Sequence, residues 1–289
     1  MNEFDPRLTP ARPDLAAQHL QGKVEAGRFA EGETYEVIES HAPVRRQPAP
    51  DAPLDTEALM GESVIVYEIT DEGYAWGQLE SDGYVGWLPA SALRRPGPAP
   101  THRVRVLRTL VFPGSSIKLP PVAAPSLGAR LAIAREQDRF AVTPAGWFVP
   151  ANHLARLDQL ESDFVAVAER FRGVPYLWGG KTSLGLDCSG LVQIALQACG
   201  IRAPRDSDLQ EQALGEPIAM AQALAGLRRG DLLFWPGHVA IARDGATLVH
   251  ANAYHMMVEI EPVAEAMARI RAAGTEITSI KRGVHRHAA

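Results

Sequence analysis

The sequence predicts an α+β fold in which small β-rich domains precede a domain with a helix followed by an antiparallel sheet. Between about residues 51 and 157, short runs of aromatic and β-branched residues alternate with Gly, Asp and Pro turns, as is typical of short strands. After residue 157, apolar residues recur first at helical spacing and then in consecutive strand-like runs. Helices and strands that are segregated along the chain favour the α+β class.

The composition excludes several classes of partner. The chain has 289 residues, 46% hydrophobic and 22% charged, which is enough for two or three compact domains. Lys and Arg number 29 against 34 Asp and Glu, so no basic excess predicts nucleic acid or an anionic membrane as partner. No apolar run approaches the roughly 18–20 residues of a membrane span, and residues 1–7 lack the apolar region of a secretory signal. With Met1 as the native start we therefore expect a cytoplasmic protein, and a mature fragment of an exported protein is the alternative.

The first half of the chain divides into three parts. Residues 1–50 are predicted to be an N-terminal extension, with a candidate helix over Asp14–His19 and an extended stretch over Thr34–Ser40. A first small β-domain is expected over residues 51–98, and a second over residues 101–157 after a Pro-rich linker.

A repeated segment supports two β-domains of the same kind. Gly86-Trp-Leu-Pro-Ala-Ser-Ala-Leu93 is echoed by Gly146-Trp-Phe-Val-Pro-Ala-Asn-His-Leu154, and the prolines and final leucines are separated by the same interval. Short strands that end on a Trp strand and a Pro turn predict two small β-barrels. The pattern resembles that of bacterial SH3 domains. Trp87 and Trp147 are then candidates for the barrel cores. Trp87 has a second interpretation, as a side chain that faces a neighbouring domain.

Residues 160–289 are predicted to form the third domain, of mixed helix and strand. Asp163 is a candidate N-cap for a helix that runs to about Phe171. A second helix is expected from Cys188 to Cys199, with Gly200 as its C-terminal stop. The expected antiparallel strands are Phe234–Trp235, His238–Ala242 and Thr247–Ala251, the last two joined by the Asp244-Gly245 turn.

Cys188 is the candidate nucleophile because it lies where a glycine-bearing loop enters a helix. The free amides and partial positive charge of a helix N-terminus lower the pKa of a thiol and can also bind the oxyanion of a tetrahedral intermediate. Cys199 lies on the apolar face of the same helix and is expected to be structural. The two thiols are roughly 16 Å apart along the helix, too far for a disulfide, which tolerates about 7 Å between Cα atoms.

Two histidines supply a base and a group that orients it. His238 opens a predicted strand after the Gly237 turn, and histidine is the usual base for a cysteine nucleophile. His250 lies on the next strand of a short hairpin, so the two rings are expected to meet. His255 is a rival for the orienting role, but strand alternation places it on the face opposite to His250 and Asn252.

Five motifs together resemble those of the NlpC/P60 family, the papain-like cysteine peptidases of bacterial cell-wall peptides. They are Pro175-Tyr-Leu-Trp-Gly-Gly180, Asp187-Cys-Ser-Gly-Leu-Val192, Gly230-Asp-Leu-Leu-Phe-Trp235, Gly237-His-Val-Ala-Ile241 and Val249-His-Ala251. Their order and spacing match the family over nearly half of the chain. The resemblance implies a papain-like catalytic domain over residues 160–289, preceded by two SH3-like barrels.

The resemblance implies a γ-D-glutamyl-L-diamino-acid endopeptidase that acts on small murein peptides of the form L-Ala-γ-D-Glu-diamino acid, without a cofactor or metal. In the family pattern Cys188 is the nucleophile, His238 the base and His250 the orienting residue. The positions implied to bind substrate or oxyanion are Tyr176, Trp178, Asp187, Ser189, Arg205, Asp206 and Ser207, with Glu62 and Tyr84 contributed by the first SH3-like domain. Asp187 is expected to pair with the free ammonium of L-Ala. A helix-capping role for Asp206 and a surface ion pair for Arg205 remain open.

Three other functions are compatible with parts of this pattern. A related papain-like amidase or acyltransferase would use the same residues on another substrate, although the SH3-like repeats favour wall peptides. A non-catalytic wall-peptide-binding protein would not need the intact Cys, His and His set. A zinc site from Cys188, Cys199, His238 and His250 fails because the two thiols are too far apart to share one ion. The sequence carries no signal for an oligomeric state.

Overall fold

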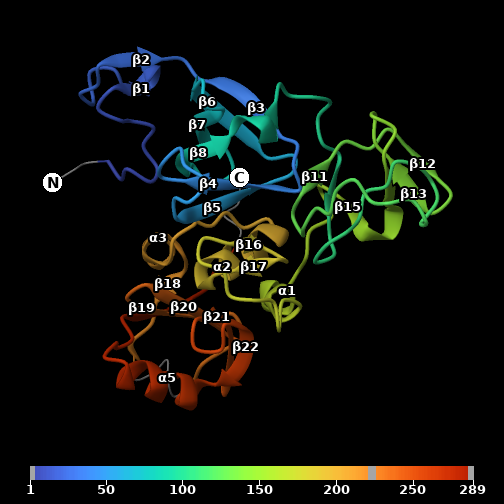
Figure 1. The fold of residues 1–289 in the computed structure, drawn as a ribbon. Helices are drawn as coiled ribbons and strands as arrows, with labels where there is room; N and C mark the ends of the chain where they lie inside the picture. The colour runs from blue at the N-terminus through green and yellow to red at the C-terminus, as the bar shows by residue number, and fades with distance from the viewer. Residues whose placement is uncertain (1–3, 221–225, 286–289) are drawn as a thin grey trace. The chain divides into compact units, whose positions relative to one another are not determined.

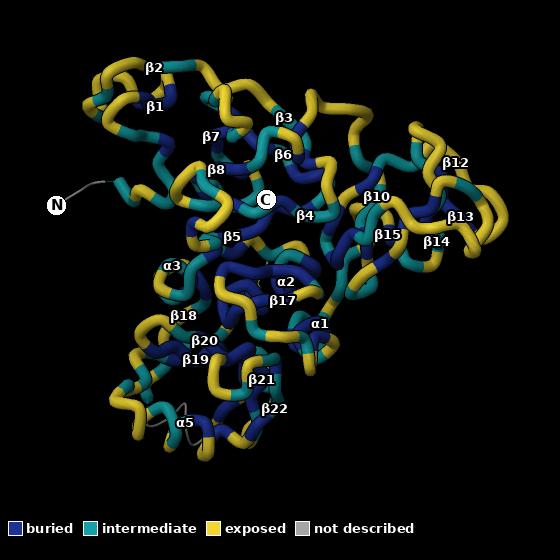
Figure 2. The backbone as a smooth tube through the Cα atoms, in the orientation of Figure 1, coloured by how far each residue is buried: buried dark blue, intermediate teal, exposed yellow. Residues whose placement is uncertain are grey.

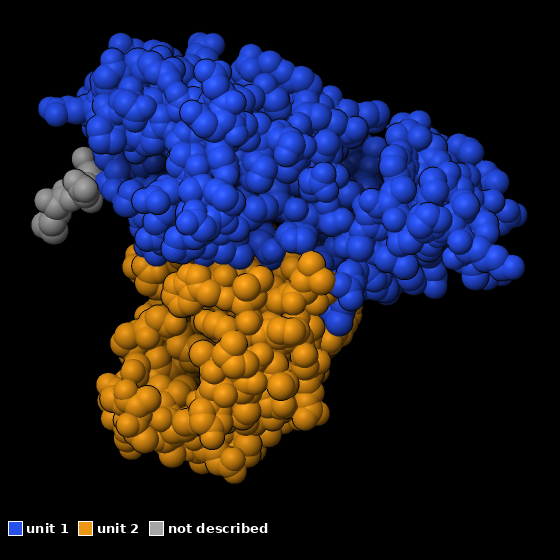
Figure 3. Space-filling view, viewed as in Figure 1, with its two compact units in different colours: residues 1–157 blue, residues 158–289 orange. Residues whose placement is uncertain are grey.

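The computed structural model describes residues 4–220 and 226–285, and the chain forms two compact units, residues 1–157 and residues 158–289 (Figures 1 and 3). The first unit is built almost entirely of short strands, and the second combines helices with a six-stranded sheet. The predicted α+β class is confirmed. No helix in the described ranges is long and apolar enough to cross a membrane.

A seven-stranded antiparallel sheet forms the centre of the first unit, in the order β5-β4-β8-β7-β6-β3-β9. Its strands are β3 (Glu33–Val37), β4 (His41–Arg45), β5 (Leu54–Leu59), β6 (Ser63–Ile69), β7 (Tyr74–Leu79), β8 (Val85–Pro89) and β9 (Leu93–Arg94). Strands β3 and β4 belong to this sheet, so the extension predicted over residues 1–50 ends too late in the chain. The reason is that Val37, Ala42 and Val44 are buried in the core of the sheet.

The predicted helix over Asp14–His19 is wrong. Residues Leu15–Ala17 form strand β1, which pairs in parallel with β2 (Arg28–Ala30), and a single 3₁₀ turn follows over Gln18–Leu20. Leu15 packs against Trp76 and Trp87, and the burial of this side chain outweighs the helix preference of the local sequence. Trp87 is only 8% exposed, and the Arg12 guanidinium lies over its ring, so Trp87 is part of a core.

The second β-region of this unit contains two three-stranded antiparallel sheets. One holds β11 (Arg130–Leu131), β10 (His102–Val104) and β15 (Leu154–Arg156), and the other β12 (Arg135–Gln137), β13 (Phe140–Val142) and β14 (Phe148–Pro150). The sequence repeat has a structural counterpart here. Both β8 and β14 end on the repeated proline, and each is followed by a 3₁₀ turn and a further strand, over Ala90–Ala92 and Ala151–His153.

The second unit is a six-stranded antiparallel sheet with helices on both faces, in the order β18-β23-β19-β20-β21-β22. The strands are β18 (Glu216–Pro217), β19 (Leu232–Trp235), β20 (His238–Ala242), β21 (Thr247–Asn252), β22 (Met257–Pro262) and β23 (Ser279–Arg282), and a separate hairpin holds β16 (Lys181–Thr182) and β17 (Gly185–Leu186). The described helices are α1 (Phe164–Glu169), α2 (Cys188–Ala198), α3 (Ser207–Ala213) and α5 (Val263–Ala272).

Helices α2 and α5 cover opposite faces of the sheet (Figure 1). The α5 side is packed by Leu233, Ala240 and Leu248 from the strands and by Val263 and Ala266 from the helix. Helix α2 contacts β20 and β21 and is buried along nearly all of its length (Figure 2). The sheet therefore holds the N-terminus of α2 next to the start of β20.

Candidate active site

The start of helix α2 is fixed by the side chain of Asp187. Its Oδ1 atom accepts a hydrogen bond from the Gly190 amide at 2.7 Å, and its Oδ2 atom accepts one from the Gly179 amide at 2.8 Å. A Cβ atom at Gly190 would lie 2.3 Å from the Gly180 carbonyl oxygen, so this position requires glycine. The sequence Asp-Cys-Ser-Gly thus caps the helix and brings the preceding loop against its first turn.

Arg205 also holds the start of helix α2, through Asp187 and Ser189. Its guanidinium donates to both carboxylate oxygens of Asp187, at 2.9 and 2.8 Å, and also to the Ser189 hydroxyl at 2.9 Å. Arg205 is 1% exposed, and Asp187 and Ser189 are buried with it. Arg205 is therefore a buried partner of Asp187 rather than a surface ion pair. The expected pairing of Asp187 with a substrate ammonium is corrected, because the carboxylate already accepts from one guanidinium and two amides.

Gln210 on α3 is a supporting residue that sequence reasoning missed. Its amide nitrogen donates to the carbonyl oxygens of Ser189 and Pro204, both at 2.9 Å, and so connects the first turn of α2 to the loop that carries Arg205. Asp206 occupies the N-cap position of α3 without a side-chain hydrogen bond to that helix, and Ser207 is the first helical residue. No local signal marks Gln210, because both of its partners lie outside its own helix.

Burial raises the pKa of the Cys188 thiol to about 12, and the charge of Asp187 acts in the same direction. The backbone amides of Val239 and Ser189 face the sulfur and lower its pKa, but by less. The expectation of a thiolate produced by the helix N-terminus alone is therefore wrong: desolvation outweighs the helix dipole, and the resting thiol is neutral. Burial also raises the pKa of Tyr176, with the Cys188 sulfur as the next cause, so the tyrosine hydroxyl lies near the sulfur and stays protonated.

The two histidines lie together as the hairpin predicts. His238 Nε2 and His250 Nδ1 are 2.8 Å apart, and burial lowers the pKa of both rings, that of His238 to about 3. His255 is placed elsewhere: its backbone amide and Nδ1 atom bond the Asn252 Oδ1 atom, at 2.8 and 3.0 Å. His238 immediately precedes Val239, whose amide faces the Cys188 sulfur, so thiol and imidazole share one site.

A carboxylate lies on the other side of His250. His250 Nε2 and Glu261 Oε1 are 2.6 Å apart, and Glu261 forms an ion pair with Arg269 of helix α5. The only sequence signal for Glu261 is an acidic residue at alternate positions of an otherwise apolar strand. Finding it requires the pairing of β21 with β22, which places Glu261 on the same face as His250.

The remaining predicted binding residues belong to different units of the chain. Trp178 lies on the loop before α2 and is 65% exposed. Glu62 is buried within the first unit, where its Oε2 atom accepts from the Leu59 amide at 2.7 Å. Tyr84 is part of the hydrophobic core of the seven-stranded sheet. The described contacts of Glu62 and Tyr84 hold the first unit together, and a part for them in substrate binding stays a prediction.

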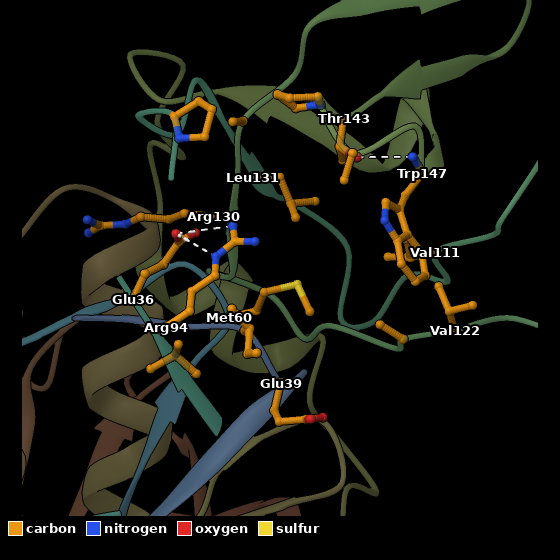
Figure 4. A pocket seen from close by; sticks show the side chains of 17 residues that line it. Glu36, Glu39, Met60, Arg94, Val111, Val122, Arg130, Leu131, Thr143 and Trp147 are labelled. Atoms are coloured by element: carbon orange, nitrogen blue, oxygen red, sulfur yellow. Dashed lines mark hydrogen bonds and ion pairs between the residues drawn. The ribbon is translucent and has the colours of Figure 1, made fainter. Parts of the chain in front are cut away.

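A separate cavity of about 430 Å³ lies within the first unit (Figure 4). Its walls include Met60, Val111, Leu131 and the 37% exposed Trp147. The polar part of the lining includes the ion pair between Glu36 and Arg94, at 3.2 Å. None of the described residues that line this cavity is a cysteine or histidine, so nucleophilic catalysis is assigned to the second unit.

Comparison with known proteins agrees with this division. Residues 44–93 match the family described as bacterial dipeptidyl-peptidase Sh3 domain, and residues 173–275 match the NlpC/P60 family. Dipeptidyl-peptidase 6 of Lysinibacillus sphaericus is 37% identical over 108 residues, which are 37% of this chain and 38% of that protein. The chain thus spans less than two thirds of this relative.

Two longer matches cover most of the chain. Gamma-D-glutamyl-L-lysine dipeptidyl-peptidase of Bacillus subtilis is 27% identical over 238 residues, 74% of this chain and 78% of that protein. The crystal structure of an NlpC/P60 family protein from Bacillus cereus superposes with a TM-score of 0.73 at 20% identity, covering 88% of this chain and 100% of that one, so the fold is shared. The chain therefore contains a domain of the NlpC/P60 peptidase family, preceded by a bacterial SH3 domain.

Proposed function

We propose that the protein is a cysteine peptidase that hydrolyses the bond between the γ-carboxyl group of D-Glu and a diamino acid in free murein peptides, L-Ala-γ-D-Glu-diamino acid. The observation that carries the proposal is the arrangement at the start of α2. There the Cys188 sulfur faces the Val239 amide, beside a His238 ring that bonds His250 at 2.8 Å. The name of the Bacillus subtilis relative, a γ-D-glutamyl-L-lysine dipeptidyl-peptidase, supports this substrate class.

The reaction begins with a neutral thiol and a neutral imidazole. His238 takes the proton from the Cys188 sulfur as the sulfur attacks the γ-carbonyl carbon, and the electron pair of the carbonyl bond moves to its oxygen. The Tyr176 hydroxyl is a donor for this oxyanion, because its raised pKa keeps it protonated. The imidazolium then protonates the leaving amine. Water, deprotonated by the same ring, hydrolyses the thioester and releases L-Ala-D-Glu.

Burial of the Cys188 thiol and the His238 imidazole is compatible with this chemistry. Since burial raises the pKa of the thiol and lowers that of His238, the charged thiolate–imidazolium pair is costly in the resting site. The charges are needed only as the carbonyl carbon is attacked, when the amides of Ser189 and Val239 face the sulfur. Turnover therefore depends on the substrate, and the resting thiol is protected from other electrophiles.

We further propose that the substrate is a released peptide with a free amino terminus, as in the recycling of wall peptides in the cytoplasm. The cation of L-Ala then needs an acidic or polar partner other than Asp187, which Arg205 already neutralises. Glu62 of the SH3 domain, suggested by sequence, is the remaining candidate for that partner.

The test is to incubate the full-length protein with L-Ala-γ-D-Glu-meso-diaminopimelate, its L-Lys counterpart and the N-acetylated form of each, and to identify the products by mass. We expect L-Ala-D-Glu and the free diamino acid from the unblocked peptides. The N-acetylated peptides should react at least about tenfold more slowly, which corresponds to about 1.4 kcal/mol. Binding without cleavage would overturn the peptidase proposal in favour of a wall-peptide-binding protein, and equal rates on blocked and free peptides would overturn the requirement for a free terminus.

A further inference from the structure

Glu261 has no part in the mechanism above, yet it lies at the end of a continuous line of hydrogen bonds from the base. His238 Nε2 is 2.8 Å from His250 Nδ1, and His250 Nε2 is 2.6 Å from Glu261 Oε1. His250 is fully buried and Glu261 is buried with it. Arg269 of α5 holds the outer side of the carboxylate in an ion pair.

The charge of Glu261 decides which nitrogen of His250 carries the proton. Burial raises the pKa of Glu261, but the hydrogen bond from His250 and the charge of Arg269 outweigh it, so the pKa is lowered and the group is ionised. An ionised carboxylate can only accept hydrogen bonds, so the proton between the two groups belongs to His250 Nε2. Burial lowers the pKa of His250, which is therefore neutral with a bare Nδ1 atom.

The amide nitrogen of Asn252 competes with Glu261 for His250 Nε2, and on its own it would favour the opposite tautomer. The Asn252 Oδ1 atom accepts from the His255 amide at 2.8 Å, which turns the amide nitrogen toward His250 Nε2, 3.0 Å away. If Nε2 were bare and accepted from Asn252, its lone pair would face the Glu261 carboxylate at 2.6 Å, and two acceptors would repel at that distance. The shorter contact therefore sets the tautomer, and Nε2 of His250 donates to Glu261.

We propose that Glu261 is a positioning residue that fixes His250 with its proton on Nε2 and thereby leaves Nδ1 of His238 free to take the proton of Cys188. The bare Nδ1 atom of His250 can only accept, so it accepts from Nε2–H of His238, and in a neutral ring this leaves the second nitrogen of His238 unprotonated. In the transfer, the S–H bond breaks, an N–H bond forms at His238 Nδ1 and the electron pair stays on sulfur. Glu261 remains ionised and stabilises the imidazolium through His250. This inference rests on the proposed cysteine-peptidase function.

The competing explanation is an ion pair that only joins β22 to α5. Because Glu261 and Arg269 carry opposite charges, their effects on the imidazole distinguish this structural role from the positioning role. The charge of Arg269 lowers the pKa of His238, because a cation disfavours an imidazolium, whereas the carboxylate of Glu261 favours one. Loss of Glu261 and loss of Arg269 break the same ion pair, but they shift the pKa of the His238 imidazole in opposite directions. The charged and titratable groups that act on the pKa of the two rings are Glu261, Arg269 and His255, besides the rings themselves.

Glu259 is the matched control. It lies two residues earlier on the same face of β22, but its carboxylate bonds Arg172 at 2.9 Å and its own strand through the Ile260 amide at 2.8 Å. Glu259 lies directly opposite His250 in the β21–β22 register, and Glu259→Ala removes a carboxylate and an ion pair there without removing any described hydrogen bond of His238 or His250. Glu261→Gln is the conservative variant, since its amide oxygen can still accept from His250 Nε2–H while the charge is lost.

The first readout is the tautomer itself, measured by two-bond ¹H–¹⁵N correlation spectra of the full-length protein labelled at histidine. We expect both His238 and His250 in the Nε2–H form in the wild type, in Glu259→Ala and in Glu261→Gln. Glu261→Ala should show a mixture of tautomers at His250. A wild-type His250 in the Nδ1–H form, or an unchanged spectrum in Glu261→Ala, would overturn the proposal. This readout needs no substrate, so it stands or falls independently of the peptidase assay.

The second readout is the pH profile of peptide cleavage. Glu261→Ala should lower kcat at least about tenfold with little change in KM, and Glu261→Gln should recover part of the loss. The pKa of the imidazole in the profile should move down in both Glu261 variants and up in Arg269→Gln. Equal losses in the Glu261 and Arg269 variants, with shifts in one direction, would show a structural ion pair. If Glu261→Ala does not fold, the directions of the imidazole pKa shifts in Glu261→Gln and Arg269→Gln are sufficient to test the proposal: opposite shifts support it, and shifts in the same direction overturn it.

Discussion

Removal of the Arg205 guanidinium tests whether the start of α2 depends on a buried ion pair. Arg205 is 1% exposed and contacts both oxygens of Asp187, at 2.9 and 2.8 Å. In Arg205→Met the carboxylate keeps the Gly179 and Gly190 amides but loses its counter-charge. Breaking a buried pair by removing one partner costs about 3–5 kcal/mol, because the other charge is left uncompensated.

The coupling free energy between Asp187 and Arg205 can be predicted as well. In the double variant Asp187→Asn, Arg205→Met no buried charge remains, so the loss should be about 1–3 kcal/mol smaller than the sum of the two single losses. Arg202→Ala is the matched control, because Arg202 lies three residues earlier in the same loop and is exposed. Its effect on the free energy of unfolding should stay within about 0.5 kcal/mol.

The assay is hydrogen exchange of the α2 amides in the full-length protein, followed by mass spectrometry. This measurement reports the opening of the second unit without assuming that both units unfold together. We expect faster exchange of α2 in Arg205→Met, and in the double variant a loss of protection free energy smaller than the two single losses combined. Protection equal to that of the wild type, combined with a raised KM for the peptide, would refute this reasoning and show that Arg205 binds substrate directly.

Three further outcomes follow from the site. Cys188→Ala should abolish peptide cleavage and leave hydrogen exchange as in the wild type. Cys199→Ala should keep the cleavage activity and lower only the denaturation midpoint, so both readouts are measured on both variants. His238→Ala should be as inactive as Cys188→Ala, and His250→Asn should retain measurable kcat, because an amide can still hold the ring of the base. The pKa of His238 falls to about 3 on folding, so the unfolded chain binds more protons below about pH 6.5. The free energy of unfolding should therefore decrease as the pH is lowered from about 6.5 to about 3, by up to about 1.4 kcal/mol per pH unit. Urea titrations at a series of pH values should show a weaker pH dependence in His238→Asn.

Local signals in the sequence were sufficient for much of the second unit. The helix from Cys188 was predictable because its capping residue, its apolar face and its stop all lie within one continuous stretch of sequence, Asp187–Gly200. Asp163 caps α1 as predicted, accepting from the amides two and three residues ahead. The approach of His238 to His250 followed from strand alternation across one short hairpin.

The errors concern contacts between segments that are distant in the sequence. Residues Leu15–Ala17 form a strand because they pair with Arg28–Ala30, which no local pattern indicates. The role of Arg205 depends on its partner Asp187, and that of Glu261 on the pairing of β21 with β22. The pKa of Cys188 depends on how far the folded chain desolvates the sulfur, a quantity that a helix N-terminus in the sequence does not reveal.

The most direct test of Cys188 as the nucleophile uses an L-Ala-γ-D-Glu analogue in which a chloromethyl ketone replaces the scissile amide. The full-length protein is treated with the analogue, digested and analysed by mass spectrometry to locate the alkylated residue. The account predicts a single adduct on Cys188, its absence in Cys188→Ala and much slower labelling in His238→Ala, since the buried thiol needs its base. Labelling of Cys199, or equally fast labelling by a chloromethyl ketone without the dipeptide, would contradict it.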